Sequence, residues 1–266
     1  MNVIVPRSAS AAGLTQRALL CALLASRALL APATSTAADA DAPPQAVFVA
    51  GIKDPDWKSY KAFLAGMKVF DQAARLAPAA PLRFVLRPRT AQATVVGVTM
   101  RIATDDGNSI AVPVDADGTF ALPRSEDAAR EGGEIVLSKR RNTLSWRPAI
   151  HSPGVPADAR RMGDLRLECL VRWSIEQADL LALFRASINV FGGPCTSAAI
   201  KVDYLSAQPL AAVYLESGAR RERLAAKWIE LDGHVYLPPV HDSSWPDDTL
   251  LRFEYLDGAA KEGGQP

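Results

Sequence analysis

The residues best suited to chemistry gather near the C-terminal end of the chain, around the stretch 238–248. Two of the three histidines, His234 and His241, lie in or beside this stretch among aspartates and serines. One hypothesis makes His241 a general base that activates Ser243 or Ser244, or a metal ligand together with nearby carboxylates. The stretch contains neither the Gly-x-Ser-x-Gly elbow of serine hydrolases nor the His-Glu-x-x-His pair of zinc enzymes. Its prolines and aspartates are typical of an ordered surface loop, so we predict no catalytic residue, no metal and no cofactor.

Three aromatic side chains flank the same stretch. If they are exposed, they can stack on a sugar or hold a peptide, whereas buried aromatic side chains pack in a core. The aromatic and titratable residues together define a candidate surface site, whose members are Trp228, His234, Tyr236, His241, Asp242 and Trp245. This site supports two alternative functions, a glycan- or peptide-binding module and a hydrolase or metal-dependent enzyme that uses the loop 238–248.

The N-terminal residues 1–38 have the features of a secretory signal peptide. They contain three arginines but no acidic residue, and an apolar run at 18–26 precedes small residues around an expected cleavage site near Ala37. The run is too short to span a bilayer, and no later stretch approaches about 20 consecutive apolar residues. We therefore expect a periplasmic or secreted protein with no membrane span in the mature chain.

The two cysteines that follow the leader are Cys169 and Cys195. An even pair in an exported chain favours a disulfide over a metal site or a redox motif. Removal of the leader leaves 27 of the 30 Lys and Arg residues against 29 Asp and Glu residues. This near-neutral balance gives no electrostatic reason to expect nucleic acid or anionic lipid as a partner.

The elements that must position these residues begin after a flexible terminus at 39–45 and a short strand at 46–50. Asp54 and Pro55 form a helix-start signal, and apolar residues continue at helical spacing, which predicts a helix at 55–77. The apolar pattern then changes to a period of two, which predicts a run of antiparallel strands. These strands are expected at 82–87, 96–102, 110–114, 119–122, 134–138 and 143–146.

A region rich in prolines and glycine predicts a linker at 151–163. Beyond it, apolar residues alternate with charged ones from Leu165 to Trp173, which predicts a strand. Ser174 and Gln177 have the spacing of a capping box, which predicts a helix at 175–188. Further strands are expected at 200–204, 211–216, 224–231, 234–237 and 250–255, followed by a disordered tail at 257–266.

An Asp-Gly pair between apolar residues occurs twice, as Asp117-Gly118 and, 115 positions later, as Asp232-Gly233. Each pair predicts a tight hairpin, and each is followed at the same distance by Leu-Pro. The order of strand, helix and further strands also recurs around the two pairs. The sequence therefore predicts an α+β, β-rich fold of two tandem duplicated modules, each similar to a β-sandwich, at 46–150 and 164–256.

The stretch from Asp115 to Leu122, which follows a predicted strand at 98–103, resembles the carboxypeptidase-regulatory-like and transthyretin-type β-sandwich modules of exported bacterial proteins. The resemblance implies a structural or binding module of the secretion apparatus or the cell envelope, with no catalytic residues to carry over. The leading hypothesis is therefore an exported, non-enzymatic binding or envelope-structural protein. Its expected partner is an unidentified protein or glycan of the cell envelope.

Overall fold

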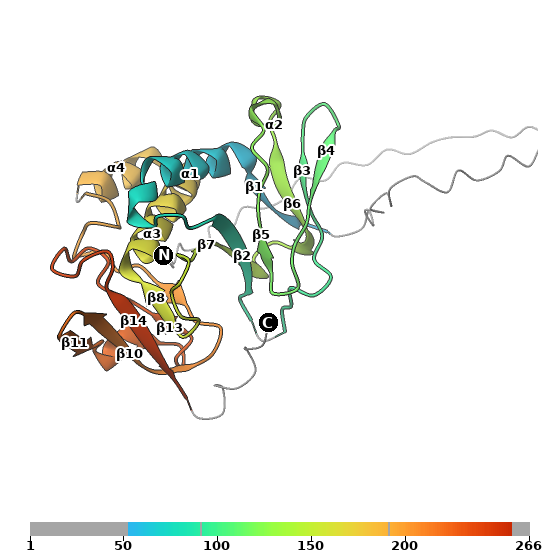
Figure 1. The fold of residues 1–266 in the computed structure, drawn as a ribbon. Coiled ribbons are helices and arrows are strands. Elements are labelled where there is room, and N and C mark those ends of the chain that lie inside the picture. The colour runs from blue at the N-terminus through green and yellow to red at the C-terminus, as the bar shows by residue number, and fades with distance from the viewer. Residues whose placement is uncertain (1–52, 91, 191, 257–266) are drawn as a thin grey trace, which may run out of the picture. The chain divides into compact units, whose positions relative to one another are not determined.

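The computed structural model describes residues 53–90, 92–190 and 192–256 (Figure 1). The predicted signal peptide, the terminus 39–45, the strand 46–50 and the tail 257–266 lie outside these residues. The described elements are, in chain order, β1 (Pro55–Ser59), α1 (Tyr60–Gln72), η1 (Ala74–Leu76), β2 (Leu82–Pro88), β3 (Met100–Ala103), β4 (Ser109–Val112), β5 (Thr119–Phe120), α2 (Glu126–Arg130), β6 (Glu134–Arg140), β7 (Leu144–Ile150), β8 (Ala159–Arg161), α3 (Met162–Glu176), η2 (Gln177–Asp179), α4 (Ala182–Val190), β9 (Tyr204–Leu205), β10 (Leu210–Ser217), β11 (Arg220–Arg223), η3 (Ala226–Trp228), β12 (Ile229–Glu230), β13 (Val235–Tyr236) and β14 (Leu250–Tyr255).

The strand connections occur twice, which confirms a duplicated α+β fold. The first four-stranded sheet has the order β1-β6-β3-β4, and the second has the equivalent order β8-β14-β10-β11. In each copy the first strand leads directly into a long helix, α1 or α3. The next strand of each copy, β2 or β9, pairs with the strand after the Asp-Gly turn, β5 or β13. All of these pairings are antiparallel, and within the described residues none of the sheets closes into a barrel.

The two Asp-Gly pairs form hairpin turns, as predicted. In the first turn Asp115 and Thr119 are joined by a backbone hydrogen bond of 2.8 Å, and the bridge from Val114 to Phe120 closes the hairpin. The second turn connects β12 to β13. Gly118 and Gly233 both have positive φ, and a Cβ atom would lie 2.8 Å from a carbonyl oxygen at the first and 2.5 Å from a backbone nitrogen at the second. Only glycine satisfies both conditions.

The predicted strand at Leu165 to Trp173 is wrong, because these residues belong to the helix α3. The predicted helix at 175–188 is also wrong: α3 ends at Glu176, and the separate helix α4 begins at Ala182. Two apolar stripes on α3 explain the error. Each stripe has helical spacing, but the two are displaced by two residues, so together they imitate the alternation of a strand. Leu167, Val171 and Ile175 enter one hydrophobic core, and Met162, Leu165 and Cys169 enter the other.

Two further boundaries differ from the prediction. The first helix begins at Tyr60 rather than at residue 55, because Pro55–Ser59 pairs with β6 as the strand β1. The predicted linker 151–163 contains the strand β8, which pairs with β14, and the start of α3. The linker region is therefore the beginning of the second copy of the repeat.

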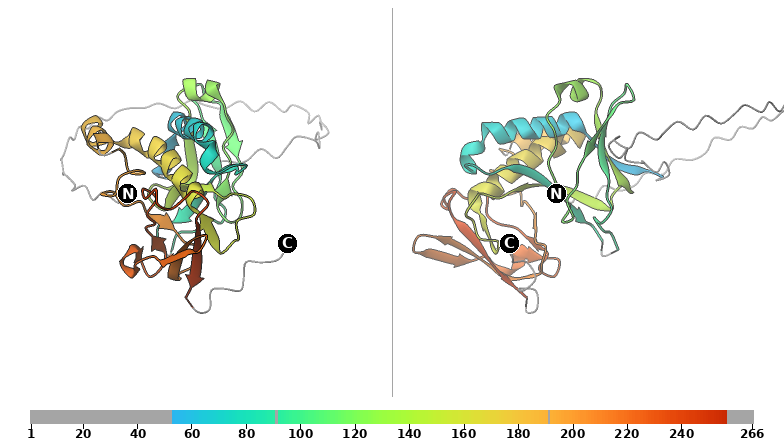
Figure 2. Two further views of the ribbon diagram at one scale, coloured as in Figure 1. Left: turned by 60° about the vertical axis from the view of Figure 1, so that its left-hand side comes forward. Right: turned by 45° about the vertical axis from the view of Figure 1, so that its right-hand side comes forward.

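The helices α1 and α3 pack side by side and join the two copies (Figures 1 and 2). A Cβ atom on Gly66 of α1 would lie 2.7 Å from Ile175, and one on Gly163 of α3 would lie 2.1 Å from the carbonyl oxygen of Leu76. The middle of α1 thus faces the C-terminal end of α3, and the start of α3 faces Leu76 in η1, just beyond α1. Both glycines permit this close approach.

The predicted disulfide between Cys169 and Cys195 is present, with a Cα–Cα distance of 5.7 Å. It links the segment that follows α4 covalently to the middle of α3. Among the described residues, no helix combines the length and the apolar character needed to cross a membrane.

Candidate functional site

The loop 238–248 is held in place by one half-buried arginine of α3. Arg166 donates hydrogen bonds to the carbonyl oxygens of Val240, Asp242 and Trp245 over 2.8–2.9 Å, and it forms an ion pair with Asp247. Four acceptors on one guanidinium group fix the loop at both ends. The loop is therefore ordered, as its turn residues predicted.

The titratable residues of this loop do not come together as a catalytic group. In the part of the chain that the structure describes, no hydrogen bond joins His241 to Ser243 or Ser244. Asp242 instead accepts a hydrogen bond of 2.9 Å from the backbone of Ser244. The side chain of Ser244, together with this backbone hydrogen bond, lowers the pKa of the Asp242 carboxyl. Burial and the nearby Lys201 lower the pKa of His241. No group of three potential metal ligands occurs among the described residues.

The candidate surface site is also divided by burial. Tyr236 and Trp245 are 1% and 3% exposed, and both pack in the second core. His234 is exposed, and Trp228 is half-buried between Lys201 and Lys227, whose amino groups lie 4.9 and 5.1 Å from its ring. The described geometry thus offers one accessible tryptophan rather than an aromatic platform.

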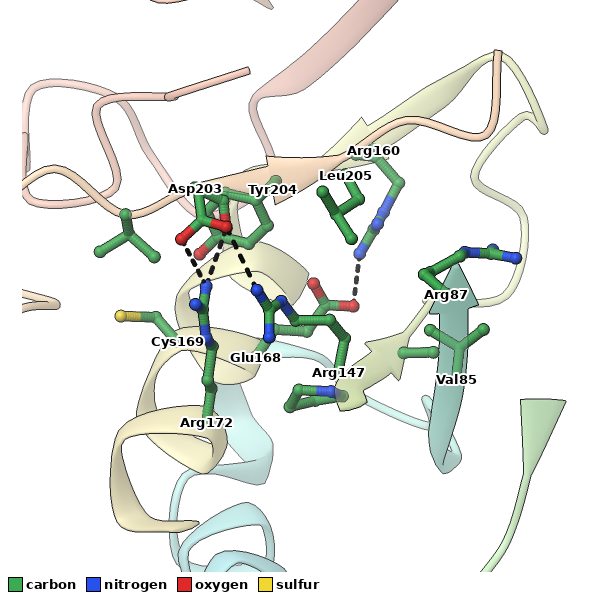
Figure 3. A pocket seen from close by; sticks show the side chains of 13 residues that line it. Val85, Arg87, Arg147, Arg160, Glu168, Cys169, Arg172, Asp203, Tyr204 and Leu205 are labelled. Carbon is green, nitrogen blue, oxygen red and sulfur yellow. Dashed lines mark hydrogen bonds and ion pairs between the residues drawn. The ribbon is translucent and has the colours of Figure 1, made fainter. Parts of the chain in front are cut away.

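A different constellation lies between the two copies of the repeat (Figure 3). It is a cavity of about 100 Å³, which we call the arginine cavity after Arg87, Arg147, Arg160 and Arg172. Its walls come from β2 and β7 of the first copy and from β8, α3 and β9 of the second. The other lining residues are Val85, Pro148, Ala149, Glu168, Cys169, Val202, Asp203, Tyr204 and Leu205.

A third stripe of α3 supplies one side of this cavity. Glu168, Arg172 and Glu176 follow one another at intervals of four residues and therefore lie on the same helix face. Arg172 donates to the backbone and side-chain oxygens of Asp203 at 2.9 and 3.0 Å and to Glu176 at 2.9 Å. Arg147 reaches the same two carboxylates at 3.3 and 3.5 Å. In Figure 3 both guanidinium groups point toward Asp203.

Arg160 closes the cavity from another side. It donates to Glu168 at 2.7 Å and to the carbonyl oxygen of Ile150 at 2.9 Å. The backbone N–H of Ile150 in turn donates to Glu168 at 2.7 Å. Nearby, the backbone N–H of Ser152 donates to Asp164 at 2.8 Å. The charged residues of α3 thus hold the end of β7 and the start of the connection to β8.

Burial and neighbouring charges shift the pKa values of the charged residues in the cavity. Burial and repulsion from Arg172 lower the pKa of Arg147, because both disfavour its charged form. Burial alone would raise the pKa of Asp203, but the guanidinium groups of Arg172 and Arg147 hold it below its ordinary value. Burial works against the charge of Arg160, but Glu168 outweighs it and raises the pKa of Arg160. The pKa of Arg87, which donates to the carbonyl oxygen of Asp117 at 3.2 Å, is lowered by burial.

Two donors of the cavity lack an acceptor. The Nε atoms of Arg147 and Arg160 are buried, and neither has a hydrogen-bond partner among the described residues. A buried N–H group without a partner costs about 1–3 kcal/mol, and more when the group is charged. The arrangement therefore suits a molecule that brings additional acceptor oxygens.

A smaller cavity of about 70 Å³ shares Arg147, Pro148 and Arg172 with the arginine cavity. Its apolar wall contains Phe63, Phe84, Trp146 and Ile175. A cationic surface and an aromatic surface therefore meet at the same arginines. Comparisons with protein-family models, with curated proteins and with solved structures found no match for this chain.

Proposed function

We propose that the protein is an exported, non-enzymatic binding protein that takes its ligand at the arginine cavity. The observation that carries this proposal is the buried pair of unpartnered guanidinium Nε donors on residues that line a cavity between the two copies of the repeat. Ligand sites commonly lie where two structural units meet and contain a few polar groups that converge. The disulfide and the sequence features of the leader support export to an oxidising compartment.

The chemistry of the cavity favours binding over catalysis. Arginine remains protonated under all ordinary conditions, so the four guanidinium groups can hold a ligand but cannot exchange protons with it. Glu168 and Asp203 are engaged by arginines, and the Tyr204 hydroxyl donates to the carbonyl oxygen of Leu165 at 2.6 Å. Cys169 is in the disulfide. These residues bind and orient, and none of them is available as a general base or a nucleophile.

The binding proposal is tested on the mature protein isolated from its own compartment. Native mass spectrometry of the wild type should detect a co-purified small molecule or a peptide. The variant Arg147→Gln should lose this species, because it removes a guanidinium group that lines the cavity. The control Arg223→Gln removes an exposed arginine of β11 that does not line the cavity, and it should retain the bound species. Identical adducts in both variants, or none in any preparation, would rule out the cavity as the binding site.

Export is tested independently of binding. Fractionation of cells that express the full chain should recover the protein outside the cytoplasm, with residues 1–38 removed and no free thiol after denaturation. A cytoplasmic protein with two reactive cysteines would contradict the export proposal.

A further inference from the structure

We propose that the arginine cavity recognises a single carboxylate group at the end of its ligand. This inference rests on the proposed binding function and names the chemical class of the ligand. The group can belong to a small organic acid or to the C-terminus of a peptide, since both present the same two oxygens.

The hydrogen-bond donors of the cavity match a carboxylate. A guanidinium group presents its N–H donors in a planar fork that fits the two oxygens of a carboxylate. Arg147 and Arg160 line the cavity, and each contributes a buried Nε–H without an acceptor. An ionised carboxylate has two oxygens and several lone pairs, so one group has enough acceptor sites for two such donors. A neutral amide has only one oxygen and brings two further donors into a surface that is already rich in donors.

The size of the cavity limits the ligand to one functional group at this position. Pockets for whole drug-sized molecules have volumes of about 300–1,000 Å³. The arginine cavity has about 100 Å³, which is smaller than the engineered cavity of about 150 Å³ that accommodates benzene. The rest of the ligand must therefore lie outside the cavity. A group at the end of the ligand fits this geometry, whereas a group in the middle of the ligand would need the cavity to be open on two sides.

The balance of charge selects a group with one negative charge. Arg147, Arg160 and Arg172 are ion-paired with Glu168, Glu176 and Asp203. Arg87, the fourth arginine, forms no ion pair within 4 Å among the described residues. It donates to the backbone carbonyl of Asp117, whose carboxylate acts on it only from a longer distance. Its charge is therefore the one that no direct ion pair compensates among the described residues. A carboxylate balances it, whereas a phosphate monoester carries about −1.5 to −2 charges at pH 7.

The adjoining aromatic wall indicates which acids to test. Phe63 lies 5.0 Å from Phe84 and 5.8 Å from Trp146, measured between ring centroids. This cluster lines the cavity that shares Arg147 with the arginine cavity. Acids with an apolar body should therefore bind at least as well as acetate.

The test follows the Nε–H signals of the arginines by NMR in the intact mature protein. The probes are acetate, benzoate, benzamide, inorganic phosphate, and a short peptide with either a free or an amidated C-terminus. We expect saturable shifts of the Arg147 and Arg160 signals with acetate, benzoate and the free peptide. Benzamide and the amidated peptide should leave these signals unchanged, because they lack the charge and the second oxygen. A response to the acids alone assigns a small-molecule ligand, and a tighter response to the free peptide assigns a peptide end.

Variants separate recognition from folding. Arg147→Gln should weaken carboxylate binding at least 10-fold, and Arg147→Lys should give an intermediate loss, because lysine keeps the charge but not the planar fork. Arg223→Gln is the control and should bind like the wild type. If Arg147→Gln is unfolded by circular dichroism, Arg87→Gln takes its place, since Arg87 is only half-buried and bonds a single carbonyl.

Three results would overturn the carboxylate assignment. Stronger shifts with phosphate than with any carboxylic acid would show that the cavity recognises a phosphate group instead of a carboxylate. The proposed binding function would remain intact. Equal responses to benzoate and benzamide would likewise reject the carboxylate but leave that function intact. Signals that respond to no anion would show a cavity filled by water alone, and together with adduct-free native mass spectra they would also reject the binding function.

Discussion

The inward-facing arginines of the cavity join different secondary-structure elements. Arg160 connects α3 to the end of β7, and Arg172 connects α3 to the residue that precedes β9. Burying such groups is unfavourable unless every charge has a partner. The polar residues between the two copies therefore contribute to the stability of the fold and also form the proposed site.

The carboxylate of Asp203 provides a stability test with a defined pH dependence. Its pKa is lower in the folded protein than in the unfolded chain, so its ionised form stabilises the fold. This stabilisation is complete above the unfolded pKa of about 3.9 and is lost as the pH falls toward the folded value. Asp203→Asn should lower the free energy of unfolding by about 1.5–3 kcal/mol at pH 7, as measured with urea. The loss should shrink at pH 3.

Asp115→Asn is the matched control for this experiment. Asp115 forms an ion pair with Arg83, but its side chain is exposed. Exposed pairs contribute about 0–1 kcal/mol, so this variant should stay close to the wild type at both pH values. An equal loss at pH 7 and pH 3 in Asp203→Asn would show that the ionised carboxylate is not the source of the stabilisation.

The sequence predicted the disulfide but not the arginine cavity, and the reason is physical. Two cysteines in an exported chain have one possible pairing. The arginines of β2 and β7 instead occupy alternating positions that indicate an outward face of a strand. Alternation shows which way a side chain points, but it does not show that α3 and β9 cover that face. The cavity depends on contacts between segments separated by more than 50 residues.

At the scale of the elements, α3 determines most of the architecture. Its first two stripes enter the two cores, its third stripe lines the arginine cavity, and Arg166 on the remaining side holds the loop 238–248. A helix that is buried on nearly all sides has no solvent-exposed polar face, so its apolar residues do not form the single stripe that identifies a surface helix. The same sequence reasoning located β2, β6, β10 and β14, because side chains in a strand alternate between its two faces with a period of two.

The close packing of α1 and α3 predicts that alanine substitutions at two helical glycines differ in their effect on stability. A Cβ on Gly66 would lie 2.7 Å from Cγ1 of the β-branched Ile175, whose side chain can shift only slightly, whereas a Cβ on Gly163 would lie 2.1 Å from the backbone oxygen of Leu76, which cannot move without the chain. Alanine also gains up to about 1 kcal/mol over glycine inside a helix. Gly66→Ala should therefore lower the free energy of unfolding by less than Gly163→Ala, which should lower it by about 1–3 kcal/mol in urea titrations. Equal effects would show that the backbone around Leu76 adapts.

The disulfide should stabilise the segment that carries α4. The two cysteines are 26 residues apart, and Ile188 is the one buried side chain among the described residues of α4. The double variant Cys169→Ser/Cys195→Ser should lose about 3 kcal/mol of stability. Its amide hydrogens in α4 should exchange much faster than those of α1. As a control, a reducing agent should lower the stability of the wild type but leave the double variant unaffected.

At the scale of the whole molecule, the copies differ most between their long helix and the following strand. Residues 73–81 connect α1 to β2, whereas residues 177–203 connect α3 to β9 and carry α4 and Cys195. The proposed site takes only Val202 and Asp203, the last two residues of the longer connection. Its other walls come from β2 and β7 of one copy and from β8, α3 and β9 of the other. Duplication thus provides a site that a single copy does not contain.

The same interlocking predicts that the first copy does not fold alone. Leu167, Val171 and Ile175 of α3 belong to the hydrophobic core of the first copy, and burying three such side chains contributes about 5–9 kcal/mol. This amount is comparable with the total stability of an ordinary domain, about 5–15 kcal/mol. A fragment of residues 53–157, which lacks α3, should therefore show no near-ultraviolet circular dichroism and no cooperative unfolding in urea. The full mature chain should unfold in one transition by both fluorescence and far-ultraviolet circular dichroism. A cooperatively folded fragment, or two separate transitions in the full chain, would instead establish the modules 46–150 and 164–256 as independent domains. The first core would then form without α3, which would only pack against it.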